Sequence, residues 1–320
     1  MKGINQKRCI SLKIDYTWYI MKAIVIGAGS DLGVHIDGAK LGSVQLLNDL
    51  QSFYKGETLS FQQPEDVIKS RNLSDREKNK YEIEEFNTKL YNTIILKSKE
   101  EFFPIVIGGD HSVSMASALA SVKNQPDIGT IWISAHTNYC TRETTTTGNI
   151  NEFSLMTVSN QKNSDFRHFH DGLIIQPSKT VIIGVREIEK GTKDDLKYSG
   201  VTVFTMDDIK EKGIEEIIEQ AFNIANFKTQ GVHISFSLDV LDPEIAPGVS
   251  APMDDGLTQE EALKIHDAIV DNIEDVVGYD LVEFNPLKDE NRKTEQIAVN
   301  LLAKVIKAVE KKDKYKKIKA

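Results

Sequence analysis

The sequence predicts an α/β protein in which a mostly parallel sheet lies between helices on both faces, giving a three-layer α/β/α arrangement. Three observations predict this class. Short apolar runs alternate with helical patterns along most of the 320 residues. Several of these runs are apolar throughout, as in strands that are covered on both faces. Polar clusters follow four of the runs, where the carboxyl ends of parallel strands would bring binding residues together.

The composition fits a globular protein with a sizeable core, because 40% of the residues are hydrophobic and 27% are charged. The formal net charge of -9 argues against a nucleic-acid partner, which usually requires a basic surface. The two cysteines are too few for a disulfide framework and favour a reducing, cytoplasmic compartment. Since no apolar run approaches the roughly 18–20 residues of a membrane span, we expect no membrane partner.

The chain predicts one domain after a short extension. Residues 1–20 contain no long apolar region and no small-residue cleavage site, so a secretory signal is not expected and their role is left open. Residues 21–320 show no internal repeat and no linker, and we expect them to form a single domain. The lysine-rich tail beyond Val309 is expected to be a solvated end.

The first half of the chain predicts covered strands and long helices. In the longest predicted helix, apolar residues recur at intervals of three and four residues, and Ser74 is placed to cap the start of the helix. Glycines 27, 29 and 33 follow the first strand without the spacing of a dinucleotide loop, so they predict a turn. The predicted elements are strands 23–27, 102–107 and 128–133 and helices 38–50, 74–97 and 115–122.

The second half continues the same alternation. Thr258 and Glu261 have the spacing of a capping box, which predicts a helix start. The predicted elements are strands 180–184, 201–204, 232–238 and 276–282 and helices 214–225, 258–269 and 294–309.

The polar stretch that ends at Asn138 is the feature most suggestive of a site. It follows the buried run that begins at Ile131, and Ser134, His136 and Asn138 alternate along it. In an extended chain these three side chains would point to the same side. The other polar clusters that follow strands are 108–112, 237–242 and 283–286.

The motifs in these clusters resemble those of the arginase/ureohydrolase family. They are Gly-Gly-Asp-His-Ser at 108–112, Ala-His-Thr at 135–137, Gly-Asn at 148–149, Asp-Val-Leu-Asp-Pro at 239–243, Gly-Leu-Thr at 256–258 and Glu-Phe-Asn-Pro at 283–286. The resemblance implies an arginase-like fold, a homotrimer, and hydrolysis of a guanidino group by two bridged manganese ions. Four aspartates and two histidines hold these ions in such enzymes.

Only part of that ligand set is present here. By the resemblance, His111 matches the histidine of one metal, and His136 and Asp239 match a histidine and an aspartate of the other. Ser134 and Ser237 stand where the family has its two bridging aspartates. These positions make the remaining ligands vestigial, and we expect no cofactor, although one weakly held metal ion is compatible with them.

Two further positions depart from the family pattern. Asn138 replaces a third ligand aspartate, so three of the four carboxylates are missing and the ligand charge falls from four negative charges to one. Asn151 replaces the histidine credited with proton shuttling, and an amide does not titrate. We therefore expect an arginase-like protein that lacks the manganese cluster and arginase activity.

The resemblance also implies substrate-binding residues. Glu283 matches the glutamate that holds the guanidinium group, a natural partner for a carboxylate. Thr147 and Asn149 lie in the loop that binds the amino-acid end. Glu187 and Glu189 replace aspartates of a second loop, and Glu189 is the candidate for α-amino recognition.

The leading hypothesis is thus a binding, regulatory or structural protein whose ligand is a small guanidino or amino-acid molecule. A second hypothesis is a metal-dependent ureohydrolase with a non-standard site, in which one ion such as zinc is bound by His136, Asp239 and His111. A third is a structural subunit that partners an active homologue.

Overall fold

The computed structural model describes residues 22–319, apart from 73, 161–165, 167–171, 187 and 189, and apart from the side chains of 190 and 313–319. The expectations for residues 1–20, Glu187 and Glu189 therefore lie outside the described residues. The strands are β1 (Lys22–Gly29), β2 (Glu57–Gln62), β3 (Phe102–Gly108), β4 (Gly129–Ile133), β5 (Thr180–Val185), β6 (Thr202–Thr205), β7 (Val232–Ser237) and β8 (Val276–Val282).

These strands form one eight-stranded sheet in the order β2-β1-β3-β8-β7-β4-β5-β6. Every pairing within the described chain is parallel. The helices are α1 (Ala39–Leu50), α2 (Lys80–Lys99), α3 (Ser114–Asn124), α4 (Ser154–Ser159), α5 (Lys190–Ser199), α6 (Met206–Lys212), α7 (Ile214–Ala225), α8 (Gln259–Asp271) and α9 (Lys293–Lys319).

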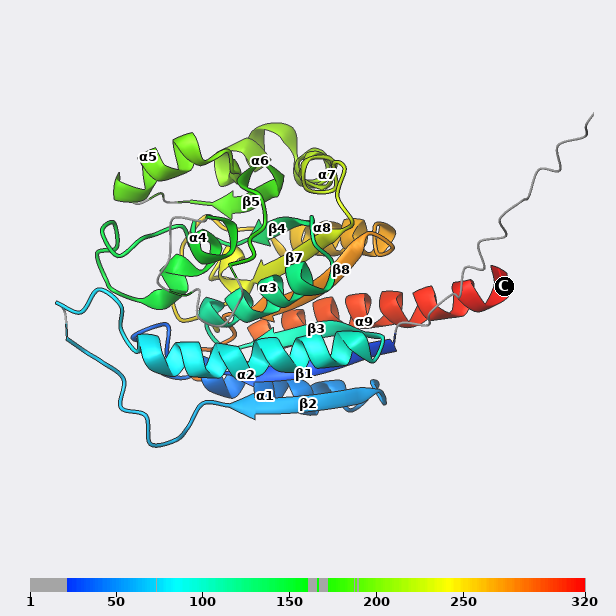
Figure 1. Ribbon diagram of the computed structural model, residues 1–320, viewed down its shortest axis with the longest axis horizontal. Helices are drawn as coiled ribbons and strands as arrows, with labels where there is room; N and C mark the ends of the chain where they lie inside the picture. Colours follow the sequence, from blue (N-terminus) through cyan, green and yellow to red (C-terminus); the bar gives the residue numbers. More distant parts are fainter. Residues whose placement is uncertain are drawn as a thin grey trace, which may run out of the picture.

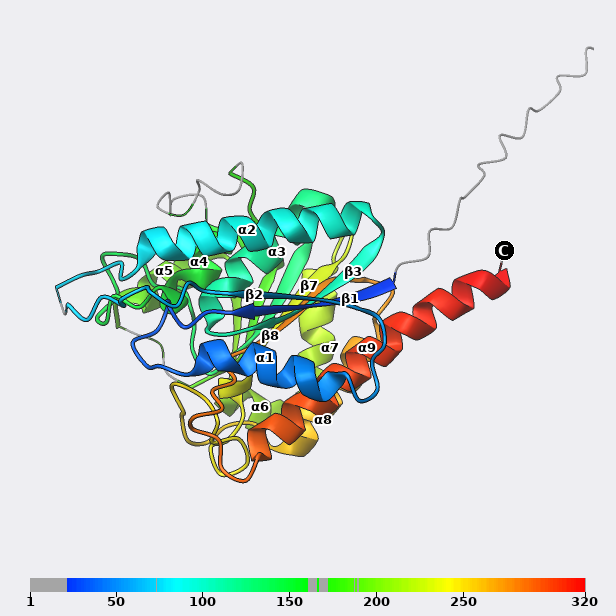
Figure 2. The ribbon, with the colours of Figure 1, turned by 90° about the horizontal axis from the view of Figure 1, so that it is seen from below.

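The helices cover both faces of the sheet, which confirms the predicted three-layer arrangement (Figure 1). Figure 2 shows α2 and α3 over one face and α1 and α9 over the other. Alternate residues of β1 face the two layers: Ile24 and Ile26 pack with the α2/α3 side, and Val25 packs with the α1/α9 side. No described helix is long and apolar enough to cross a membrane.

The start of the longest early helix was predicted six residues too soon. The helix begins at Lys80, after Asn79 adopts a left-handed φ of 57°. The backbone N–H and hydroxyl of Ser74 instead donate to the side-chain oxygen of Asn72, at 3.0 and 2.9 Å. A local side-chain turn thus competes with helix capping at Ser74.

Other differences concern elements that the periodicity did not indicate. β2 lies at the edge of the sheet, and α5 and α6 flank the opposite edge strand β6. α9 begins one residue before the predicted helix and extends to Lys319 rather than Val309, so it projects beyond the sheet (Figure 2). A helical backbone in a lysine-rich segment gives no apolar stripe by which the sequence could reveal it.

Candidate functional site

The four polar clusters meet at the carboxyl edge of the sheet, as predicted. They follow β3, β4, β7 and β8, which lie side by side in the order β3-β8-β7-β4. Gly109 allows the loop after β3 to lie against the loop after β1, because a Cβ at this position would lie 1.8 Å from the carbonyl oxygen of Ser30. The parallel topology therefore brings together residues that are far apart in the sequence.

The centre of the site is an ion pair between His136 and Asp239. Nδ1 of His136 lies 3.0 Å from Oδ2 of Asp239. Oδ1 of the same carboxylate accepts hydrogen bonds from the Ser134 hydroxyl at 3.2 Å and from the Ala135 N–H at 3.1 Å. Asp239 is buried, whereas the His136 side chain is 35% exposed.

The contact between His136 and Asp239 shifts the pKa of both side chains. Burial acts to raise the pKa of Asp239, but the hydrogen bond and charge of His136 outweigh it and hold that pKa well below its usual range. Burial acts to lower the pKa of His136, but the hydrogen bond and charge of Asp239 raise it above the ordinary value.

The predicted alternation of Ser134, His136 and Asn138 is wrong at the last residue. The strand ends at Ile133, and Asn138 has a left-handed φ of 48°. Its side-chain oxygen accepts a hydrogen bond from the indole N–H of Trp132 at 2.9 Å. Asn138 therefore bonds to Trp132, whereas the side chains of Ser134 and His136 bond to Asp239.

His111 is buried next to the same tryptophan. Its ring stacks on Trp132 with centroids 4.5 Å apart, and its Nε2 lies 3.0 Å from the hydroxyl of Ser235. Burial lowers the pKa of His111 to about 4, so the ring is neutral near neutral pH. Its other ring nitrogen, Nδ1, is buried without a hydrogen-bond partner among the described residues.

Glu283 closes the site from the end of β8. It has a left-handed φ of 69°, a strained conformation for a residue with a Cβ. Its Oε1 accepts hydrogen bonds from the His111 N–H at 2.8 Å and from the Asn151 amide at 3.4 Å. Burial, together with the charges of Asp239 and Asp110, raises the pKa of Glu283 to about 8.

The loop residues expected to bind substrate are held by protein partners. The Thr147 hydroxyl donates to Glu152, and the Asn149 amide nitrogen lies 3.1 Å from Nδ1 of His35. Three buried oxygens at or beside the site have no partner in the described part of the chain. They are Oδ1 of Asn149, Oδ1 of Asn151 and Oγ of Ser237.

The comparisons with known proteins agree with this geometry. A model of the Arginase family matches residues 21–307. The chain belongs to the arginase family. It is 32% identical to an arginase of Staphylococcus aureus (strain MRSA252) over 240 residues, which cover 74% of this chain and 78% of that protein. It is 31% identical to an arginase of Bacillus caldovelox over 228 residues, covering 69% and 74% of the two chains.

Solved structures show the same fold. The crystal structure of the arginase from Bacillus subtilis is 28% identical and has a TM-score of 0.75, covering 89% of this chain and 98% of its own. The arginase of Entamoeba histolytica in complex with L-ornithine has a TM-score of 0.80 at 24% identity, covering 90% of this chain and 99% of its own. The latter likeness concerns the fold alone.

In this arginase-family chain, sequence reasoning missed the residue that clamps the Asp239 segment. The guanidinium of Arg186 donates to the carbonyl oxygens of Asp239 at 2.8 Å, Val240 at 2.9 Å and Met253 at 2.9 Å. Its position directly after a strand that is buried on both faces could have indicated a role at the carboxyl edge of the sheet. Arg186 thereby fixes the backbone that presents Asp239 to His136.

Sequence reasoning also missed the polar groups behind His111. Asp280 is a buried charge inside the apolar strand β8, and its carboxylate accepts a hydrogen bond from the Ser235 hydroxyl at 2.6 Å. A charge in the middle of an apolar run was the signal that could have revealed it. Ser235 thus links Asp280 to His111.

Proposed function

We propose that this arginase-family chain has lost the binuclear manganese cluster and does not hydrolyse arginine, and that it retains the site to bind a small guanidino or amino-acid ligand. Three neutral residues at the ligand positions carry the first part of the proposal. They are Ser134, Asn138 and Ser237.

The remaining donors do not suit a pair of dications. Manganese prefers several oxygen ligands, chiefly carboxylates, but Asp239 already bonds to Ser134, Ala135 and His136. Among the residues that the structure describes, no group of three or more His, Cys, Asp or Glu side chains is arranged to hold a metal. Two unit charges about 4 Å apart repel by about 4 kcal/mol at an effective dielectric constant near 20, and two dications repel about four times as strongly. Without bridging carboxylates this repulsion is not offset.

The buried atoms that lack protein partners support the binding part of the proposal. Nδ1 of His111, Oγ of Ser237 and Oδ1 of Asn149 and Asn151 all lie at or beside the carboxyl edge, with no hydrogen-bond partner in the described chain. Such atoms are costly unless a ligand or water satisfies them. Glu283 would face the guanidino group, as the family resemblance implies.

The assembly and location belong to the same proposal. By their resemblance to arginases, copies of this chain would form a homotrimer, and the cysteine usage favours the cytoplasm. In this reading the trimer acts as a binding, regulatory or structural unit.

Metal content and urea release test the proposal together. We expect purified protein incubated with excess manganese and then desalted to retain no stoichiometric metal by mass spectrometry, and to release no urea from arginine. Two ions per chain with urea release would overturn the loss of function. Binding of arginine measured by calorimetry in the presence of a chelator would support the retained site, and absence of binding for arginine and ornithine would refute that second part.

The alternative is a ureohydrolase that uses one ion, such as zinc, at a non-standard site. The bare Nδ1 of His111 is the observation that favours it, because an unprotonated imidazole nitrogen is a common zinc ligand. The ion would need His136 and Asp239 to give up their mutual contact. Anomalous scattering from zinc-soaked crystals distinguishes the alternatives, since a peak between these three residues would favour a mononuclear site.

A further inference from the structure

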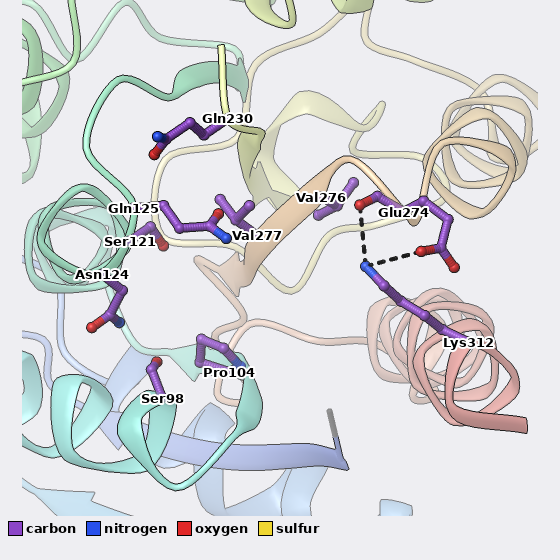
Figure 3. A pocket seen from close by; sticks show the side chains of 10 residues that line it. All are labelled: Ser98, Pro104, Ser121, Asn124, Gln125, Gln230, Glu274, Val276, Val277 and Lys312. Atoms are coloured by element: carbon purple, nitrogen blue, oxygen red, sulfur yellow. Dashed lines mark hydrogen bonds and ion pairs between the residues drawn. The ribbon is translucent and has the colours of Figure 1, made fainter. Parts of the chain in front are cut away.

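A polar cavity lies at the amino edge of the sheet, opposite the candidate site. It has a volume of about 280 Å³ and lies where α2 and α3 end and where β3 and β8 begin (Figure 3). Neutral polar side chains line much of it. They are the hydroxyls of Ser98 and Ser121 and the carboxamides of Asn124, Gln125 and Gln230.

The charged groups in the lining compensate each other. Nζ of Lys312 donates to the carbonyl oxygens of Ile273 and Glu274 at 3.0 and 3.2 Å, and it lies 3.8 Å from the Glu274 carboxylate. A charged ligand would therefore lose hydration without gaining a counter-charge. Carboxamides both donate and accept hydrogen bonds, so the lining matches an uncharged ligand that does the same.

We propose that this cavity binds a small uncharged carboxamide and that a buried chain of hydrogen bonds transmits its binding to His111. The apolar part of the lining favours a flat ring on the ligand. Pro104, Val276 and Val277 provide it. The proposal does not depend on what the carboxyl-edge site binds.

The chain of hydrogen bonds begins in the cavity itself. The hydroxyl of Ser121 lies 3.0 Å from Nδ1 of His233, and Nε2 of His233 lies 2.8 Å from Oδ2 of Asp280. His233 and Asp280 are fully buried, and Ser121 is 3% exposed. The chain thus enters the interior directly from the cavity wall.

The second half of the chain reaches the candidate site. Oδ1 of Asp280 accepts hydrogen bonds from the hydroxyls of Ser235 at 2.6 Å and Ser114 at 2.7 Å. The hydroxyl of Ser235 donates its only proton to this carboxylate. Its oxygen therefore accepts a hydrogen bond from Nε2–H of His111, with the nitrogen and oxygen 3.0 Å apart. Because the ring proton of His111 is then on Nε2, Nδ1 carries no proton and its lone pair has no hydrogen-bond partner among the described residues.

Ser121 is the point at which a ligand would act. In the tautomer in which Nε2–H of His233 donates to Asp280, Nδ1 of His233 is an acceptor. The Ser121 proton then has two acceptors, this Nδ1 at 3.0 Å and the carbonyl of Ser117 at 3.3 Å. Gly278 permits this arrangement, because a Cβ there would lie 2.6 Å from the Ser121 hydroxyl and 2.9 Å from Nδ1 of His233. A ligand that bonds to Ser121 weakens or strengthens the hydrogen bond at Nδ1 of His233. Because hydrogen bonds in a chain polarise one another, this changes the bond from His233 to Asp280 and, through the shared carboxylate, the bonds from Ser235 and from His111.

Nicotinamide is the probe, with nicotinate and 3-(aminomethyl)pyridine as an anion and a cation of similar shape. In full-length protein with ¹⁵N-labelled histidine rings, we expect nicotinamide to shift the His233 and His111 signals saturably in the millimolar range. Each charged analogue should bind about tenfold more weakly, equivalent to about 1.4 kcal/mol. Absence of any shift, or equal affinity for nicotinate, would overturn the proposed ligand class.

Two matched variants test the connection. S98A and S121A each remove one hydroxyl from the cavity, but only S121A interrupts the hydrogen-bonded chain. We expect S98A to preserve the His111 shift and S121A to abolish it while nicotinamide still binds, as measured by saturation transfer. A His111 shift that persists in S121A, or that is absent from wild-type protein with nicotinamide bound, would refute the connection.

Discussion

Nδ1 of His136 lies 3.0 Å from Oδ2 of Asp239, and this contact occupies the one carboxylate that the family resemblance implies as a remaining metal ligand. The D239N variant keeps the shape of the side chain and removes its charge. We expect the pKa of His136 to fall in this variant, because the partner that raises it is gone. NMR titration of the His136 ring measures the shift. S134A is the matched control, since it removes a hydroxyl from the same carboxylate and leaves the ion pair; an equal fall in S134A would contradict the assignment.

The same pair has a defined effect on stability. A histidine whose pKa is raised by folding contributes stability that is present in full below its unfolded value of about 6.5, and this contribution is lost as the pH rises through the folded value. D239N should therefore destabilise the fold more at pH 6 than at pH 9. Urea unfolding at the two pH values measures the difference, and an equal loss at both would show that the pair does not stabilise the fold through the charge of His136.

Restoring the missing carboxylates should restore metal binding. In the S134D/N138D/S237D variant we expect close to two manganese ions per chain, because the other ligand positions already lie at the same sheet edge. The S134N/S237N variant is the control, since it adds similar volume without charge and should retain no metal. Urea release from arginine should remain low, because Asn151 cannot transfer protons. A folded triple-aspartate variant without metal would show that these strand ends are misassigned.

Asn138 should matter for stability through its contact with Trp132. N138A leaves the buried indole N–H without an acceptor and places alanine at a φ of 48°, so we expect a loss of about 2–4 kcal/mol in the free energy of unfolding. N138D retains an acceptor for the indole but loses the amide that donates to the Asn151 carbonyl oxygen at 3.0 Å, so we expect a loss that is smaller than in N138A but not negligible. Urea unfolding compares the two variants, and equal losses would mean that the hydrogen bond contributes little.

His266 should make the fold sensitive to acid. Burial lowers its pKa to about 4, and its ring nitrogens lie 2.8 Å from the Ala262 carbonyl and 2.9 Å from the Tyr279 hydroxyl. The unfolded chain therefore binds more protons between about pH 6.5 and pH 4, and stability falls as the pH falls through this window. H266Q should flatten the slope by up to about 1.4 kcal/mol per pH unit, without changing it above pH 7. Guanidinium unfolding at a series of pH values measures the slope of stability against pH, and an unchanged slope in acid would contradict the prediction. Some slope should remain in the variant, because burial also lowers the pKa of His111.

The sequence by itself determined the α/β class, most of the strands and the edge of the sheet at which the site lies. Apolar runs such as 102–107 indicate covered strands, because burial on both faces leaves no polar alternation. The polar residues after such runs locate the site, since the carboxyl ends of parallel strands share one edge. The sequence also shows serine at positions 134 and 237, where the family resemblance implies carboxylates.

Only the tertiary structure decided how those residues pair. Alternation predicted that Ser134, His136 and Asn138 point to the same side, but the strand ends before them and Asn138 turns to Trp132. The bond between Asp239 and His136 joins residues 103 positions apart, and no local pattern specifies such a contact. The buried link from Ser121 through Asp280 to His111 exists because α3 packs on β7 and β8, and hydrogen bonds between separate elements depend on that packing rather than on periodicity.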